Sequence, residues 1–164
     1  MSGNIAIGIQ DFSTIIQGNY FYIDKTPFIK EWWDCGDSAT LITRPRRFGK
    51  TLTMSMVEQF FSIDYAGRSD LFEHLAIWKE EKYRELQGTY PVISLSFARI
   101  KERDYEKTKQ KMCEVLRNIY IKFCYIKDSE KLTDADRAYY ERMLEENIKE
   151  TDATSSLYQL SGSQ

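Results

Sequence analysis

The chain has 164 residues, 42% of them hydrophobic and 14% aromatic, which suits one folded globular domain rather than a disordered segment. Its 23 Lys and Arg residues nearly balance 25 Asp and Glu, for a net charge of -2, which argues against a surface built throughout for nucleic acid. No apolar run of about 18 residues and no secretory signal is found, so we expect no membrane span and a cytoplasmic location.

The three cysteines, Cys35, Cys113 and Cys124, are widely spaced and form no CxxC pair. His74 is the single histidine, which removes the usual zinc pattern. We therefore predict buried, reduced thiols, as expected in the cytoplasm.

The first elements are a short strand and a helix. Residues 20–23 are aromatic and β-branched and favour a strand. Thr26 is placed to cap a helix whose first position is Pro27, where a missing N–H costs nothing. Apolar residues at helical spacing follow, and Gly36 predicts the end of this helix.

A second strand, a basic loop and a second helix come next. Residues 39–43 predict a buried strand, and residues 44–49 form a tight basic loop. From Lys50 onward the pattern is helical, with one apolar face formed by Leu52, Met56, Val57, Phe60 and Phe61. Residues 63–88 contain only short or charged segments. Residues 91–97 (PVISLSF) predict another buried strand.

The last third of the chain predicts two helices, over about residues 104–125 and from about Thr133 onward. Asp136, three residues after Thr133, makes a weak capping box. Residues 155–164 form a polar tail. The alternation of strands and helices predicts an α/β domain with a mostly parallel sheet. Together with the phosphate-binding motif described below, it predicts a three-layer domain of the P-loop NTPase type. At most three strands are predicted, which is fewer than such a sheet usually has. We therefore expect the domain to be incomplete at its C-terminal end.

The basic loop matches much of the phosphate-binding P-loop pattern G-x-x-x-x-G-K-[ST]. Residues 44–51 read RPRRFGKT, so Gly49, Lys50 and Thr51 fit, whereas Arg44 stands in place of the first glycine. The predicted position between an apolar strand and an amphipathic helix is the context that this motif requires.

Each part of the motif has a physical role toward ATP and Mg²⁺. Gly49 allows a close backbone approach to phosphate, and the N–H groups of the new helix point at the anion. Lys50 supplies a charge to the phosphates, and the Thr51 hydroxyl is the predicted Mg²⁺ ligand. The candidate nucleotide-binding residues are Pro45, Arg46, Arg47, Phe48, Gly49, Lys50, Thr51 and Leu52. No catalytic residue is assigned.

Three stretches also resemble the bacterial AAA-ATPase-like family: YIDKT at residues 22–26, LITRPRRFGKTL at residues 41–52 and PVISLSF at residues 91–97. The resemblance covers about residues 8–160 and implies that residues 1–164 are the N-terminal part of a P-loop ATPase domain. In that family the position of Arg44 is often not glycine. Many members carry a downstream PD-(D/E)XK nuclease-like domain, which implies nucleic acid as a partner of the longer protein. By analogy, Asp24, Lys25 and Thr26 lie near the nucleotide base; helix capping with a salt bridge is the alternative.

Hydrolysis needs an acidic residue at the tip of an apolar strand to hold Mg²⁺. Residues 91–97 are followed by Ala98 and Arg99 instead, although Arg99 at a strand end is itself a candidate ligand contact. We therefore expect the 164-residue chain to bind ATP without hydrolysing it, and the complete protein to be the ATPase. An unfinished sheet edge would also favour self-association.

Two other functions stay open. One is a binding or interaction module whose degenerate loop holds no nucleotide, which Arg44 and the missing acid favour. The other is an anion or nucleic-acid contact surface, for which Tyr139 and Tyr140 offer base-stacking rings, but the basic residues are confined to one loop.

Overall fold

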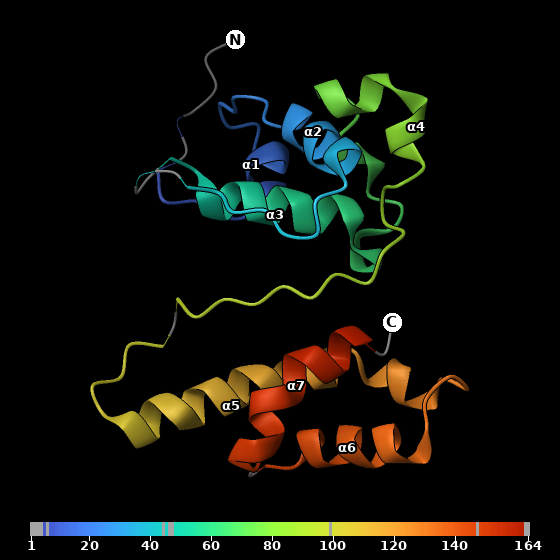
Figure 1. Cartoon of the computed structure of the whole chain (residues 1–164). Helices are drawn as coiled ribbons and strands as arrows, with labels where there is room; N and C mark the ends of the chain where they lie inside the picture. Colours follow the sequence, from blue (N-terminus) through green and yellow to red (C-terminus); the bar gives the residue numbers. More distant parts are fainter. Residues whose placement is uncertain are drawn as a thin grey trace. The chain divides into compact units, whose positions relative to one another are not determined.

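The computed structural model of the chain describes residues 5, 7–43, 45, 48–98, 100–146 and 148–162. Its contacts divide the chain into two compact units, Met1–Val92 and Ile93–Gln164, and each is described by itself (Figure 1). Within the described residues the regular elements are helices and there is no sheet. The predicted three-layer α/β fold with a mostly parallel sheet is therefore wrong.

The predicted strands do not form, because a strand needs a neighbouring strand to accept and donate its backbone hydrogen bonds. Among the described residues, β-type pairing is limited to one isolated parallel bridge between Ser62 and Tyr90. Within the predicted strands, Phe21 is 62% and Leu41 85% exposed, so neither run is buried. Strand propensity measures how well side chains fit a pleated, half-buried surface, and here no such surface forms. The sheet edge on which we predict self-association is absent from the described residues, and self-association itself stays a prediction.

The first unit consists of short helices joined by turns. Its α-helices are α1 (Phe12–Gln17), α2 (Pro27–Cys35), α3 (Lys50–Phe61) and α4 (Glu81–Arg84), and its 3₁₀ turns are η1 (Ile63–Tyr65), η2 (Ser69–Leu71) and η3 (Ala76–Lys79). As predicted, Pro27 opens α2, and Gly36 ends it in the left-handed conformation at φ 64°. Helix α1 packs on α3, and α2 packs on η3.

The core of the first unit is aromatic. Phe12, Phe60 and Phe72 are each 0% exposed. The ring of Phe72 stacks on Phe12 at 5.2 Å and meets Phe60 edge-on at 5.1 Å between centroids. Gly88 allows its own segment to approach the backbone of Phe60 and Ala66 closely. Its N–H donates to the Phe60 carbonyl over 2.8 Å, and an added Cβ would lie 2.5 Å from the Ala66 Cα. The rings of Phe12 on α1, Phe60 on α3 and Phe72 just after η2 thus hold separate short elements together.

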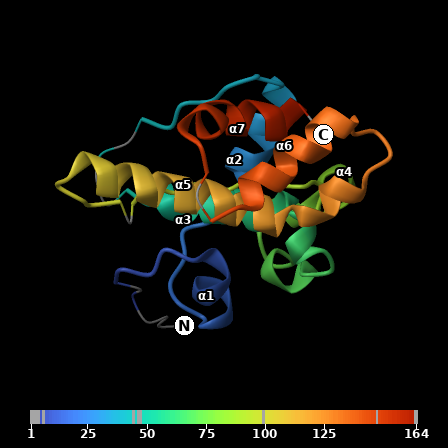
Figure 2. The same cartoon turned by 90° about the horizontal axis from the view of Figure 1, so that it is seen from below.

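The second unit is built from three longer helices and one 3₁₀ turn: α5 (Tyr105–Lys122), η4 (Cys124–Asp128), α6 (Asp134–Leu144) and α7 (Glu150–Gly162). Each of the three α-helices contacts the other two (Figures 1 and 2). Asp104 caps α5 by accepting the Lys107 N–H, and Thr133 with Asp136 forms the predicted capping box of α6.

The polar tail contains a helix that the sequence did not predict. Residues 155–162 lie within α7. Ser156 is 0% and Leu160 1% exposed, so this weakly apolar helix buries one narrow face. A small buried serine lets helices approach closely, and packing of that kind gives only a faint hydrophobic pattern.

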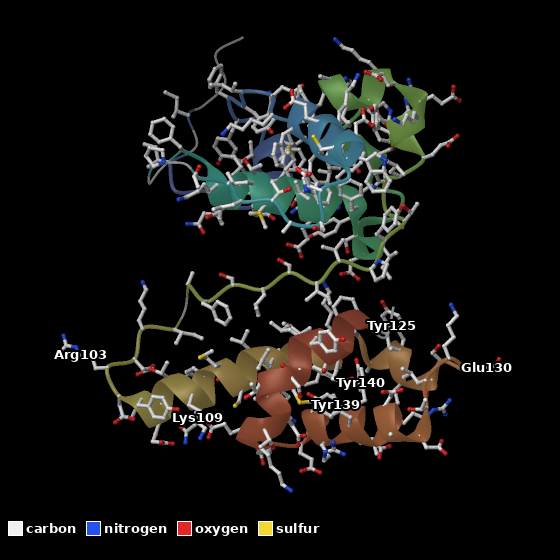
Figure 3. The ribbon with its side chains drawn as sticks, viewed as in Figure 1. Arg103, Lys109, Tyr125, Glu130, Tyr139 and Tyr140 are labelled. Carbon is white, nitrogen blue, oxygen red and sulfur yellow. The ribbon has the colours of Figure 1, made fainter. Side chains whose placement is uncertain are left out.

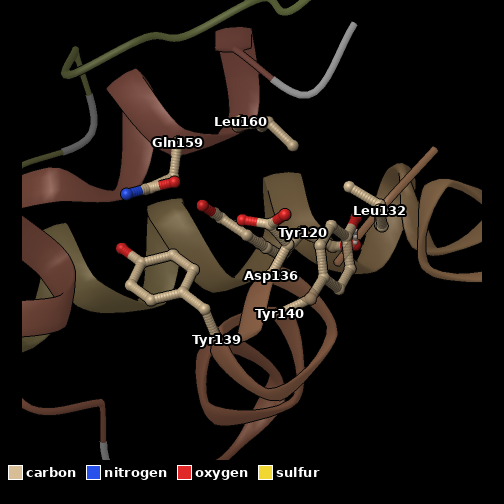
Figure 4. Close-up of a pocket in the computed structure, with 7 residues that line it drawn as sticks. All are labelled: Tyr120, Leu132, Asp136, Tyr139, Tyr140, Gln159 and Leu160. Atoms are coloured by element: carbon tan, nitrogen blue, oxygen red, sulfur yellow. Dashed lines mark hydrogen bonds between the residues drawn. The ribbon is translucent and has the colours of Figure 1, made fainter. Parts of the chain in front are cut away.

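Tyrosine hydroxyls join the helices of the second unit. Tyr120 donates to the Ser156 carbonyl over 2.7 Å, and Tyr140 donates to the Tyr120 carbonyl over 2.8 Å. Tyr139 and Tyr140 point from α6 toward the other two helices (Figure 3). The hollow beside them, of about 10 Å³ (Figure 4), has room for about one water molecule. Burial raises the pKa of both Tyr120 and Tyr140.

The cysteines also differ from the prediction. All three are free, but Cys35 and Cys124 are exposed and Cys113 is half-buried, so the predicted burial is wrong. Cys35 is the last residue of α2, where a side chain can face solvent. Over the described part of the chain, no helix is long and apolar enough to cross a membrane.

Candidate functional site

The predicted phosphate-binding loop leads directly into helix α3. Gly49 is the N-cap residue and adopts the left-handed conformation, with φ 74° and ψ 21°. Its carbonyl accepts the Thr53 N–H at 2.8 Å and the Thr53 hydroxyl at 3.0 Å, which closes the first turn of the helix. A residue with a Cβ is strained at this φ, so the glycine is required by the turn itself.

The other predicted site residues fall into three groups. Phe48 (60% exposed) and Pro45 lie open to solvent, as do Lys50 and Thr51 in the first turn of α3. Leu52 is instead partly buried and packs against the aromatic core. Arg44, Arg46, Arg47 and Arg99 lie outside the described residues, and their predicted roles stay predictions.

A second lysine reaches this loop from a distant part of the chain. The Lys25 ammonium donates to the Phe48 carbonyl over 3.3 Å. The same nitrogen lies 2.6 Å from the point where a Cβ on Gly49 would stand. The sequence gives no local sign of this contact, because 23 residues separate positions 25 and 48. The YIDKT stretch is therefore joined to the loop by a contact that sequence reasoning missed.

Lys25 is flanked by the half-buried Asp24 and the buried Thr26, which form a polar clamp. The Asp24 carboxylate accepts the Thr26 N–H and hydroxyl through Oδ1, at 2.8 and 2.7 Å, and the Ala76 N–H through Oδ2, at 2.7 Å. Thr26 is 0% exposed, and its hydroxyl accepts the Ile77 N–H at 3.1 Å. Both side chains thus tie the segment before α2 to the first turn of η3.

This clamp corrects the predicted cap of α2. Thr26 has helical dihedrals, φ -63° and ψ -23°, and makes no side-chain capping bond to its own helix. A capping side chain needs extended backbone at that position to reach back to the N–H groups of the first turn. The hydroxyl serves η3 instead, where a buried N–H would otherwise have no acceptor.

Helix α3 is itself anchored from the side of α1. Asp11 caps α1 by accepting the Thr14 N–H at 2.7 Å, and its other oxygen accepts the Gln59 amide of α3 at 2.6 Å. Burial acts to raise the pKa of Asp11, but the hydrogen bonds from Ser13, Thr14 and Gln59 outweigh it and hold the pKa below its usual value. Tyr22 packs beside them, and burial raises its pKa to about 12.

The described cavities lie away from the predicted site residues. One of about 180 Å³ in the first unit is lined by Ile16, Asn19, Tyr20, Asp70, Leu71, His74 and Leu75. The small hollow of the second unit contains both tyrosines proposed for base stacking. Tyr140 is 4% exposed, and the hydroxyl of Tyr139 donates to the Asp152 carbonyl, so both rings serve packing.

Comparison with known proteins identifies the family. The family model described as "Predicted AAA-ATPase" matches residues 6–158. An "Uncharacterized protein in vnfD 5'region" of Azotobacter chroococcum mcd 1 is 33% identical over 113 residues. That alignment covers 68% of this chain and 20% of the relative, so the chain spans about a fifth of the relative's length. No solved structure matches. The matched region includes the YIDKT stretch, the loop and the start of α3, and the chain belongs to the AAA-ATPase-like family.

Proposed function

We propose that the first unit binds ATP by holding its phosphates on the loop of residues 44–51 and on the N-terminus of α3. One observation carries the proposal: in a member of the AAA-ATPase-like family, Gly49 takes the left-handed conformation immediately before Lys50 and Thr51 open a twelve-residue helix. The N–H groups of a helix's first turn have no partner within the helix. N–H groups at a helix start commonly bind anions, which the helix dipole also attracts.

The side chains around this helix start suit a polyphosphate. Lys50 and Thr51 are exposed in the first turn, and Lys25 adds a second ammonium group next to Gly49. Under this proposal Lys50 contacts the β- and γ-phosphates, while the backbone of Phe48 to Leu52 surrounds them. The aromatic core beneath α3 fixes the helix axis and hence the direction of its N–H groups.

Mg²⁺ would accompany the nucleotide. Within the described residues no cluster of three or more His, Cys, Asp or Glu could hold a metal by itself. That fits an ion carried mainly by phosphate oxygens and water, as Mg²⁺ often is, with the Thr51 hydroxyl as the protein ligand. Removing that hydroxyl should weaken Mg-ATP more than metal-free ATP.

The test is calorimetric titration of Mg-ATP into wild type, Lys50→Ala and the matched control Lys79→Ala, an exposed lysine of the same unit. We expect Lys50→Ala to lose at least about tenfold in affinity, because a charge-assisted contact is worth about 1.5–3 kcal/mol. Lys79→Ala should bind as wild type does. Equal affinities for wild type and Lys50→Ala would refute the assigned site. No binding in any protein would favour the interaction module with a degenerate loop.

We further propose that this 164-residue chain does not turn ATP over, and that hydrolysis belongs to the complete protein. Residues 91–97, which form no strand in the structure, are followed by Ala98 rather than by an acid. Asp24, the acid nearest to Lys25 in the chain, uses both carboxylate oxygens in the clamp. A phosphate-release assay should show no multiple turnover. Turnover that Lys50→Ala abolishes would contradict this and would identify a base elsewhere in the chain.

A further inference from the structure

We propose that Lys25 is a positioning residue for phosphate binding, which holds the Phe48–Gly49 peptide group so that the Gly49 N–H faces the anion. The inference rests on the proposed ATP site and adds a residue to it from outside the motif. It concerns the orientation of one peptide plane, immediately before the lysine and threonine that complete the motif.

The orientation follows from peptide geometry. In a planar trans peptide the C=O and N–H bonds point in opposite directions. The Phe48 carbonyl accepts a hydrogen bond from the Lys25 ammonium at 3.3 Å. The N–H of Gly49, which belongs to the same peptide group, must therefore point away from Lys25. Under this proposal, that side is the one that faces the phosphate.

Lys25 can do this because its backbone is held on both sides. Asp24 and Thr26 are fixed by the clamp to η3, and the Lys25 N–H donates to the Tyr22 hydroxyl at 3.3 Å. The clamp does not involve the ammonium, so the side chain remains available for the loop. Ordering a long side chain costs conformational entropy, and an anchored stem lowers the freedom that must be lost.

The Lys25 ammonium also occupies space that a side chain at position 49 would need. The ammonium nitrogen lies 2.6 Å from the position that a Cβ at residue 49 would occupy, so the lysine fills the place next to a bare glycine. Its recorded acceptor is a neutral carbonyl rather than a carboxylate. The positive charge is therefore not neutralised by that contact and adds to the potential at the loop.

The experiment uses the whole chain with Lys25→Met, which removes donor and charge, and Lys25→Arg, which keeps both. Lys79→Met is the matched control. Mg-ATP affinity is measured by calorimetry, and the Gly49 amide resonance is recorded without nucleotide. We expect Lys25→Met to weaken Mg-ATP by about tenfold or more, the size of one lost charge-assisted hydrogen bond. Lys25→Arg should recover most of that loss, and Lys79→Met should match wild type.

The Gly49 amide separates this role from general destabilisation. Its resonance should shift in Lys25→Met and return toward the wild-type position in Lys25→Arg, while the melting temperatures stay close. If Lys25→Met does not fold, Lys25→Leu, which also removes the donor and the charge, replaces it. Wild-type affinity in a folded Lys25→Met, or an unshifted Gly49 amide, overturns the inference while the ATP site stands. A wild type that binds no Mg-ATP overturns the ATP site itself, and the inference with it.

Discussion

The two units of the chain differ in the buried polar contacts that join their elements. In the first unit, side-chain oxygens collect backbone N–H groups from remote loops: Asp24 accepts from Ala76, 52 residues away, and Thr26 accepts from Ile77. In the second unit, tyrosine hydroxyls donate to backbone carbonyls of neighbouring helices, as Tyr120 does to Ser156 and Tyr140 to Tyr120.

The difference follows from helix length. Every α-helix leaves four N–H groups and four carbonyls without partners in its own ladder. In elements of three to six residues such as η3 and α1 these groups dominate, so acceptors from elsewhere must satisfy them. In α5, with 18 residues, the ladder satisfies most of the backbone. Side chains then only fix how helices pack. The unit that needs remote polar contacts is also the one that carries the loop.

The largest expected effect tests whether aromatic packing or polar contacts dominate the first unit. Phe60→Ala should lower its free energy of unfolding by about 3–5 kcal/mol, because the side chain is fully buried and leaves a cavity. Trp32, Trp33 and Trp78 all lie in this unit, so tryptophan fluorescence during denaturation reports on it alone. Met54→Ala, on an exposed site of the same helix, should change little. A loss below about 1 kcal/mol for Phe60→Ala would contradict the assigned core.

A smaller effect tests the polar clamp. Thr26→Val keeps the side-chain shape but leaves the Ile77 N–H without its acceptor, at a cost of about 1–3 kcal/mol. Thr26→Ser keeps the hydroxyl and should recover most of that stability. The same fluorescence measurement serves for both. Equal stability of the Val and Ser variants would show that the clamp contributes nothing to the first unit.

The matching change in the second unit should be milder. Tyr140→Phe removes the bond to the Tyr120 carbonyl, a net loss of about 1 kcal/mol. The carbonyl it leaves lies in the last turn of α5, and an unpaired carbonyl is tolerated more often than an unpaired N–H. Far-UV circular dichroism follows the helices, and Tyr105→Phe, at an exposed site, is the control. A larger loss than that of Thr26→Val would reverse the comparison between the units.

The smallest effect depends on pH. The pKa of Asp11 is held below its ordinary value of 3.8 in the folded chain. Its carboxylate therefore stabilises the fold fully above that value, and the contribution is lost as the pH falls through the lower, folded pKa. Wild type should exceed Asp11→Asn in stability near neutral pH, and the difference should shrink in acid. A difference that is constant from pH 7 to about pH 2 would contradict this linkage.

The sequence by itself determined the elements that depend on neighbours along the chain. Pro27 and Gly36 bound α2 because their φ preferences act locally. Thr133 and Asp136 form a capping box within one turn. The left-handed conformation of Gly49 before an amphipathic helix also follows from a local preference, that of glycine for positive φ. The family could be predicted because its motifs are short continuous stretches of sequence.

Tertiary structure alone decided the rest. Whether residues 91–97 join a sheet depends on a partner strand, and apolar composition cannot supply one. Among the side chains of α7 whose burial the structure describes, Ser156 and Leu160 alone are fully buried, too few to mark the helix in the sequence. The contact between Lys25 and the Phe48 carbonyl joins segments 23 residues apart. The clamp that holds the residues on either side of Lys25 reaches η3, which is farther still along the chain. Such contacts arise from packing in three dimensions, which short-range patterns in a single sequence do not encode.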